Sequence, residues 1–327
     1  MSNAIQRRFA LIATVLTLAS TTVLPAVAAE FPERPIRIVV PYSAGGGADT
    51  LARVIARRLG TDLKGTVLVE NKPGATGTLG AAAVHQAPAD GYTLLLGNSA
   101  TNAIAPAIYD HLPYSPLKDF VPVAQLTTLG NAIAVNPSLP VHNIKELVAW
   151  SKKAANDGSY GSWGEGSGGQ LAMEKIKADT GMKMAHIPYK GTAPALNDVM
   201  AGILPVTMAD VTGVGPFHQA GKVRVIAVTG SKRAPSMPDV PTVAEQGIPF
   251  DTDSWFALFA PANTPPRILA ALREAVARVL AQPDIPKVVL NFGMNVSTIT
   301  PDEFAAVQRK DVLTWAQLAK ASKVKMD

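Results

Sequence analysis

The chain contains no cysteine among its 327 residues, which excludes disulfides, thiolate metal sites and a cysteine nucleophile. No lysine–arginine run is interleaved with aromatic residues, so the sequence argues against a nucleic-acid partner. The five histidines are scattered, without a pair at metal-ligand or Ser-His spacing, and we expect neither a metal site nor a cofactor. After the N-terminal segment, no uninterrupted apolar run is long enough to cross a bilayer.

Sequence motifs of several enzyme classes are also missing. The glycines at 45–47 do not fit G-x-G-x-x-G, and no Lys-Ser or Lys-Thr pair follows them as a P-loop requires. The segments around Ser99 and Ser167 each lack one glycine of the G-x-S-x-G nucleophile elbow. We therefore predict a binding protein rather than an enzyme. The alternative is an exported hydrolase or lyase that acts on a small carboxylate in the cleft where a binding protein would hold its ligand.

The N-terminus, residues 1–29, has the layout of a secretory signal peptide. Two arginines precede an apolar stretch over 9–27, and small residues follow, so we predict cleavage near Ala28 or Ala29. Threonines, a serine and a proline interrupt the stretch, which makes it less apolar than a membrane anchor. We predict an exported, periplasmic protein. Without the signal peptide the net charge falls from +5 to +3, which is too mild to indicate a polyanionic partner.

Strand-like and helix-like segments alternate along the mature chain, which predicts an α/β fold with mostly parallel strands. The expected strands are 36–40, 67–69, 93–96, 132–135, 159–161, 206–209 and 223–228. A first helix is expected from Asp49, as its N-cap, to a capping glycine at Gly60. Capping-box spacings begin further helices at Asn143 and Thr300, and a proline pair at 265–266 precedes another.

Two segments, 126–135 and 253–260, resemble crossings between domains. We predict a first domain from 30–128 plus 253–327 and a second domain from 129–252. Two domains joined by a pair of crossing strands suit hinge closure around a ligand in the cleft between them.

The most informative loop runs from Tyr42 to Asp49. It contains Ala44 and three consecutive glycines, including Gly45 and Gly46, between an apolar strand and an amphipathic helix. Glycine allows close approach of the backbone to a ligand, and a helix N-terminus offers free N–H groups to a carboxylate or phosphate. The alternatives are a simple tight turn for the glycines and a structural cap for Asp49.

Three more polar or glycine-rich loops follow strands. In parallel sheets, ligands gather at the carboxyl ends of strands, so we expect the loops 71–80 and 97–102 to lie beside the first. The loop 161–170 and the aspartate after strand 206–209 could face them across the cleft, although a flexible surface loop and a helix cap are the alternatives. The candidate ligand-binding residues here are Thr76, Gly77, Asn98, Ser99, Thr101, Gly166, Ser167, Gln170 and Asp210.

Several segments together resemble the Bug family, the extracytoplasmic solute receptors of tripartite tricarboxylate transporters. The matching segments are FPERPIRIVVPYSAGGGADTLAR at 31–53, VENKPGATGTLGAAAV at 69–84, ADGYTLLLGNSATNAIAPAIY at 89–109, LPYSPLKDFVPVAQL at 112–126, AHIPYKGTAPALNDVMAG at 185–202, KVRVIAVTGSKRAPSMPDVPTVAEQG at 222–247 and WFALFAPANTP at 255–265. The likeness covers nearly all of the mature chain.

The resemblance implies a two-domain periplasmic-binding-protein fold, a Venus flytrap of the type II-like class, that closes on a small carboxylate. Backbone N–H groups, hydroxyls and ordered water of the first domain would hold that carboxylate. The resemblance also implies delivery to membrane permease subunits; a sensor kinase is a further possible partner, and we expect a monomer. Two departures bear on ligand identity: Gln170 stands where relatives often carry histidine, and 202–205 reads GILP instead of G-[QE]-[IV]-[DQ].

Overall fold

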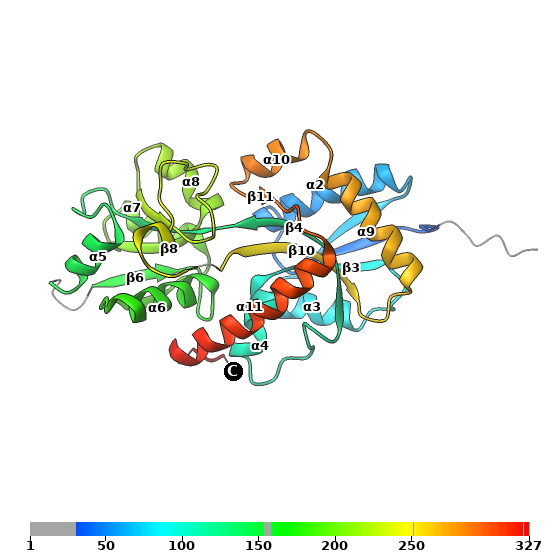
Figure 1. Cartoon of the computed structure of the whole chain (residues 1–327), viewed down its shortest axis with the longest axis horizontal. Helices are drawn as coiled ribbons and strands as arrows, with labels where there is room; N and C mark the ends of the chain where they lie inside the picture. The colour runs from blue at the N-terminus through cyan, green and yellow to red at the C-terminus, as the bar shows by residue number, and fades with distance from the viewer. Residues whose placement is uncertain (1–30, 154–157, 251, 323, 327) are drawn as a thin grey trace, which may run out of the picture. The chain divides into compact units, whose positions relative to one another are not determined.

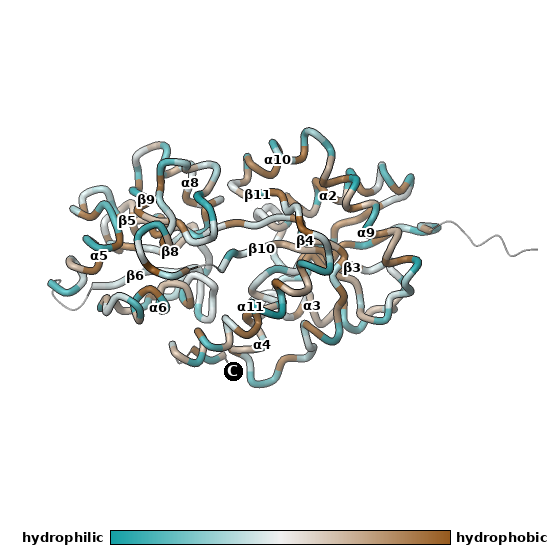
Figure 2. The backbone as a smooth tube through the Cα atoms, viewed as in Figure 1, coloured by the Kyte–Doolittle hydropathy of each residue, from teal (hydrophilic) through white to brown (hydrophobic). Residues whose placement is uncertain are grey.

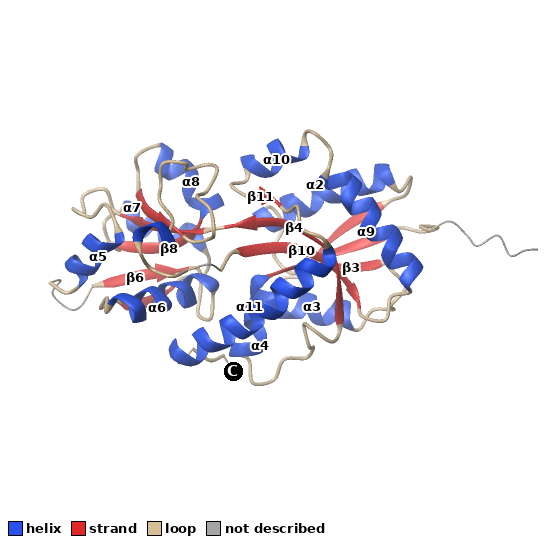
Figure 3. Cartoon of the chain, viewed as in Figure 1, coloured by secondary structure: helices blue, strands red, loops and turns tan. Residues whose placement is uncertain are grey.

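The computed structural model describes residues 31–153, 158–250, 252–322 and 324–326. The predicted signal peptide, 1–29, lies outside these residues. Residues 34–327 form one compact unit, and its described part contains two β-sheets (Figure 1). Figure 3 shows the strands of both sheets with helices around them.

The larger sheet has six strands in the order β11-β4-β10-β3-β1-β2. Its strands are β1 (Ile36–Val40), β2 (Val67–Asn71), β3 (Thr93–Asn98), β4 (Phe120–Leu129), β10 (Ser254–Pro261) and β11 (Asn295–Val296). The β-branched run of β1 is buried on both faces of the sheet, except at Arg37, which suits a central strand flanked by parallel neighbours.

The smaller sheet has five strands in the order β7-β6-β8-β5-β9. Its strands are β5 (Asn131–Val135), β6 (Ser159–Ser162), β7 (Ala185–Pro188), β8 (Val206–Asp210) and β9 (Arg224–Val228). The larger sheet is therefore built from both ends of the chain and the smaller sheet from its middle. The predicted domain boundaries themselves remain predictions.

The expectation of mostly parallel strands is wrong for the described residues. Pairings among β1, β2 and β3 and among β6, β7 and β8 are parallel, but β10 is antiparallel to β3 and β4, and β5 is antiparallel to β8 and β9. The cause is the pair of crossing segments. β4 leads through Gly130 into the smaller sheet and β10 begins the return, so these neighbours run in opposite directions (Figure 1).

Both predicted capping boxes are confirmed. Asn143 accepts a hydrogen bond from the backbone N–H of Glu146 at the start of α5 (Ile144–Ser151), and Thr300 does the same for Glu303 at the start of α11 (Pro301–Ser322). The other α-helices of the described ranges are α2 (Gly47–Asp62), α3 (Thr78–His85), α4 (Ala105–Ile108), α6 (Gly168–Thr180), α7 (Thr192–Met200), α8 (Val211–Gln219), α9 (Pro266–Leu280) and α10 (Ile285–Asn291).

The predicted ends of α2 are wrong. Its N-cap is Gly46, without a side-chain cap, and Asp49 lies inside the first turn. Gly60 lies within the helix instead of ending it. A Cβ at Gly60 would approach the carbonyl oxygen of Gly65 to 3.0 Å, so this glycine serves close packing of the following loop.

Among the described residues, buried apolar side chains form a cluster against each sheet. In the cluster on the larger sheet, the Trp255 ring meets Phe304 edge-on at 4.9 Å and its indole nitrogen donates to buried Asp311 at 2.8 Å. Figure 2 shows hydrophobic residues along the chain around β3 and β4. Within the described ranges, no helix has the length and apolarity needed to cross a membrane, and no acidic or histidine cluster could hold a metal ion.

Candidate ligand-binding site

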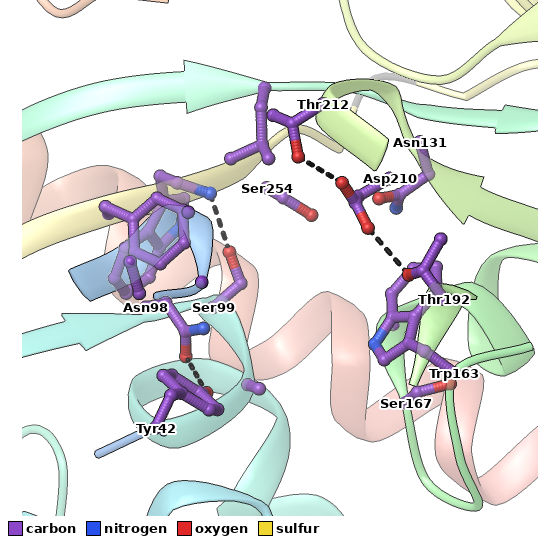
Figure 4. Close-up of a pocket in the computed structure, with 18 of the residues that line it drawn as sticks. Tyr42, Asn98, Ser99, Asn131, Trp163, Ser167, Thr192, Asp210, Thr212 and Ser254 are labelled. Atoms are coloured by element: carbon purple, nitrogen blue, oxygen red, sulfur yellow. Dashed lines mark hydrogen bonds between the residues drawn. The ribbon is translucent and has the colours of Figure 1, made fainter. Parts of the chain in front are cut away.

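A cavity of about 440 Å³ is lined by loops from both sheets. The first wall consists of the loop between β1 and α2, the short helix Ala75–Gly77, the end of β3 with the residues after it, and the start of β10. The second wall consists of the loop after β6 and the starts of α6, α7 and α8. Figure 4 shows polar side chains of both walls around this cavity.

Hydrogen bonds fix the orientation of the Asn98 amide in the first wall. Its Oδ1 accepts from the Tyr42 hydroxyl at 3.0 Å and from the Thr101 backbone N–H at 3.1 Å. Burial raises the pKa of Tyr42 well above its usual range, which keeps the phenol protonated and able to donate. Because the oxygen is held this way, the Nδ2 group of Asn98 remains as a donor for the cavity that it lines.

Ser99 supplies a second donor to the first wall. It is only 4% exposed, and its Oγ accepts from the backbone N–H of Trp255 at 2.9 Å, which leaves the hydroxyl proton for the cavity. The α2 start, with Gly46, Gly47 and Ala48 in the lining, adds N–H groups and the positive end of a helix dipole. This wall therefore offers several donors without a cationic side chain.

Asp49 supports this wall from behind and does not line the cavity. Its carboxylate accepts from the Gly45 backbone N–H at 2.9 Å, from Arg53 Nε at 3.0 Å and from Asn71 Nδ2 at 3.0 Å. The Arg53 hydrogen bond is the largest of the causes that lower the pKa of Asp49 to about 2. Asn71 also donates to the Tyr42 carbonyl at 3.0 Å, so this network holds both ends of the loop.

Gly77 explains how three loops of the first wall pack together. Its φ is +94°, and an added Cβ would lie 2.7 Å from Thr101 Cγ2 and 3.2 Å from the Tyr42 hydroxyl. Only glycine tolerates both this backbone and this approach. Gly77 and Thr101 are therefore packing residues beneath the lining, while neighbouring Thr76 faces the cavity.

Asp210 organises the second wall. Its carboxylate caps α8 by accepting from the Gly213 backbone N–H at 2.7 Å and from the Thr212 hydroxyl. It also accepts from the hydroxyl of Thr192, the first residue of α7, at 2.6 Å (Figure 4). One carboxylate thus ties together the starts of two helices and offsets the partial positive charge of both.

The loop after β6 turns several of its polar groups away from the cavity. Ser167 caps α6 by accepting from the Gln170 backbone N–H at 3.2 Å, and it lines the cavity. Gln170 accepts from the Gly166 backbone N–H at 2.7 Å and closes the loop on itself. Neither Gln170 nor Gly166 belongs to the lining.

A Ser–His contact lies deeper in this wall. Ser162 Oγ is 2.7 Å from His186 Nε2, and the Ser167 hydroxyl donates to Ser162 at 3.1 Å. Burial lowers the pKa of His186. Ser162 is fully buried and does not line the cavity, so it cannot reach a bound molecule as a nucleophile would.

The cavity brings half of the predicted binding residues together. Those in the lining are Tyr42, Gly46, Thr76, Asn98, Ser99, Ser167 and Asp210. Those outside it are Ala44, Gly45, Asp49, Gly77, Thr101, Gly166 and Gln170.

Sequence reasoning missed much of the rest of the lining. The residues absent from the prediction are Gly47, Ala48, Ala100, Ile104, Leu129, Asn131, Trp163, Gly168, Gly191, Thr192, Thr212, Ser254, Trp255, Phe256 and Met294. A signal existed for some of them. Asn131 and Ser254 lie in the two predicted crossing segments, and Gly191 precedes a helix as Gly46 does.

Comparison with known proteins identifies this arrangement. The family described as tripartite tricarboxylate transporter family receptor matches residues 51–323. The chain belongs to this receptor family. The predicted resemblance is thereby confirmed, and a family of receptors supports the prediction of a binding protein rather than an enzyme.

Solved structures similar to this receptor share its fold. The periplasmic binding protein BugD has a TM-score of 0.78 at 34% identity, over 91% of this chain and 100% of that one. An R. palustris protein solved with adipate has a TM-score of 0.81 at 32% identity, over 90% and 99% of the two chains. MatC from Rhodopseudomonas palustris, with bound malate, has a TM-score of 0.77 at 32% identity, over 88% and 99%. The predicted two-domain α/β periplasmic-binding-protein fold is confirmed.

Proposed function

We propose that this receptor captures a small carboxylate in the cavity between its two walls and delivers it to the membrane permease subunits of a tripartite transporter. The first wall supports this best: Asn98 Nδ2, the Ser99 hydroxyl and the α2 start offer donors to one region of space. Hydrogen bonds to an ionised group are worth about 1.5–3 kcal/mol each, so a carboxylate held there needs no arginine.

In the proposed pose the carboxylate lies against the first wall, and the rest of the ligand extends to the second. Tyr42 and Thr76 would border the carboxylate, while Ser167 and Asp210 would face the remainder. The predicted binding residues outside the lining would then act indirectly, by fixing the loops that carry the lining.

We further propose that the protein is exported to the periplasm with cleavage near Ala28 or Ala29, and that it works as a monomer. Its division into 30–128 plus 253–327 and 129–252 would let the two parts close on the ligand about the crossing strands. Presentation of the bound ligand to a sensor kinase is a second use of the same closed state.

The function is tested by thermal shift with a library of dicarboxylates, tricarboxylates, amino acids and aromatic acids, including malate and adipate. We expect at least one carboxylate to raise the melting temperature, because binding to the folded state alone stabilises it. A product assay by mass spectrometry follows for each hit. Turnover of a hit at catalytic rates would favour the hydrolase or lyase alternative and refute the receptor assignment.

Gly46→Val tests the proposed pose. Gly46 has φ −80° and ψ 173°, which any residue adopts, and the nearest heavy atom to an added Cβ is the Ser43 carbonyl oxygen at 3.8 Å. Valine is therefore expected to fold, while its methyl groups cover the N–H groups of the α2 start. Losing one charge-assisted hydrogen bond, about 1.5–3 kcal/mol, lowers affinity about tenfold or more. Unchanged affinity by calorimetry, in a variant with unchanged melting temperature, would place the carboxylate elsewhere.

A further inference from the structure

Trp163 forms an aromatic face on the second wall. It follows β6, and its ring rests on the first turn of α6, where a Cβ at Gly169 would lie 2.4 Å from Trp163 Cζ3. The ring therefore packs directly on the helix backbone at Gly169, a contact that a side chain at this position would prevent. Figure 4 shows Trp163 beside Thr192 and Ser167, across the cavity from Tyr42 and Asn98.

Aromatic side chains are concentrated in the cavity. Aromatic residues make up 6% of the chain, yet four of the 22 lining residues are aromatic: Tyr42, Trp163, Phe256 and Trp255, the last with its ring packed on Phe304 in the core. Ile104 adds an aliphatic surface near Trp163, because a Cβ at Gly168 would contact both Ile104 Cδ1 at 3.5 Å and Trp163 Cζ2 at 3.8 Å. A ligand that reaches the second wall therefore meets a flat apolar surface.

The charges of the lining accommodate one carboxylate and disfavour a second. No lysine, arginine or histidine is among the lining residues, and Asp210 is their one carboxylic acid. Lys190 precedes Gly191 in the chain but is exposed and does not line the cavity. The starts of α6 and α7 also bring backbone N–H groups to the second wall, through Gly168 and Thr192. A second ligand carboxylate there would nevertheless lie beside the Asp210 carboxylate without a cationic side chain, and the repulsion of like charges disfavours it.

We infer that this cavity selects an aromatic monocarboxylate, with its ring against Trp163 and its carboxylate on the first wall. Trp163 is then the residue that determines specificity for a flat ligand. The inference rests on the proposed function and narrows its ligand class. It distinguishes this receptor from the relatives solved with adipate and malate, which hold aliphatic dicarboxylates.

The test compares benzoate with cyclohexanecarboxylate, adipate and malate by isothermal titration calorimetry. Benzoate and cyclohexanecarboxylate share one charge and a six-carbon ring, but only benzoate is flat. Aromatic pairing adds about 0.5–1.5 kcal/mol beyond buried area, so benzoate is expected to bind about twofold to tenfold tighter than cyclohexanecarboxylate. Against adipate and malate the expected advantage is about tenfold or more, since each brings a second desolvated charge.

Two variants of Trp163 test whether this residue causes the preference for benzoate over cyclohexanecarboxylate. Trp163→Leu is expected to abolish the advantage of benzoate over cyclohexanecarboxylate, whereas Trp163→Phe keeps a flat ring and most of the advantage. Trp150→Phe, in α5 on the apolar cluster of the smaller sheet, is the matched control and should leave all four affinities unchanged. Melting temperatures establish that each variant is folded.

The outcomes separate the inference from the function beneath it. Tighter binding of adipate or malate than of benzoate would overturn the inference while the receptor assignment stands. Equal losses of affinity for benzoate and cyclohexanecarboxylate in folded Trp163→Leu would also overturn it, because Trp163 would then respond to the size of the ligand ring and not to its flatness. Failure of the four probes and of the whole carboxylate library to bind would refute the proposed function itself.

Discussion

Replacing Asp49 by asparagine should destabilise the protein without touching the cavity lining. The carboxylate accepts from the Gly45 backbone N–H, Arg53 Nε and Asn71 Nδ2 while only 3% of the residue is exposed. An amide in its place loses the charge and sets an N–H group against one of these donors. The loop that carries Tyr42 and Gly46 then loses its support.

The magnitude follows from the pKa of Asp49. It is lowered from 3.8 to about 2, first by the Arg53 hydrogen bond. A lowered carboxyl pKa stabilises the folded state above the unfolded pKa, and this stabilisation is lost as the pH falls through the folded pKa. The carboxylate should therefore contribute about 2 kcal/mol at pH 7 and about half of that at pH 3.

Urea denaturation of the wild type and Asp49→Asn, followed by tryptophan fluorescence from pH 7 down to pH 3, measures this difference. The matched control is Asp284→Asn, because Asp284 is half-exposed and pairs with Arg58 at the surface. The control should cost only about 0–1 kcal/mol. A difference for Asp49→Asn that stays constant with pH, or that does not exceed the control, would show that the loop does not depend on this charge.

Two further substitutions test the packing around the cavity. Gly77→Ala should lower the free energy of unfolding by about 2–4 kcal/mol, because it combines strain at φ +94° with the 2.7 Å approach to Thr101 Cγ2; a loss below about 1 kcal/mol by urea denaturation would contradict this. Gly130→Ala places a Cβ 2.4 Å from the Thr229 carbonyl oxygen at the crossing between the sheets, so we expect a loss of about 1–3 kcal/mol; an unchanged melting temperature would show that the crossing adjusts freely.

Features set by neighbouring residues were predictable from the sequence. The strand Ile36–Val40 has its predicted ends, and the capping boxes at Asn143 and Thr300 form as their spacing indicates. Each depends on side chains within a few positions of the backbone groups that they satisfy. Asp210, at the end of a strand, likewise caps the helix that follows by accepting from the Gly213 backbone N–H.

Features set by contacts between distant parts of the chain were not predictable from the sequence. Aspartate is a residue type typical of an N-cap, but Asp49 accepts hydrogen bonds from Arg53 and from Asn71, which is 22 residues away in the sequence. These bonds hold its carboxylate behind the loop instead of at the helix start. The antiparallel pairing of β10 depends on where the chain returns, which local periodicity does not report. Trp163 lies in the loop 161–170, where the glycines and Ser167 carry the sequence pattern, and its place in the lining depends on packing against α6 that this pattern does not report.

The crossing between the sheets has a consequence for how such a receptor could change its ligand. Leu129 and Asn131, which flank Gly130, and Ser254, which begins β10, all lie in the cavity lining. The same short segments therefore shape the space for the ligand and connect the parts that would move around it. A substitution there that fits a new ligand would also alter the cost of closing, so changes of specificity are more readily accommodated at positions such as Trp163, away from the crossing.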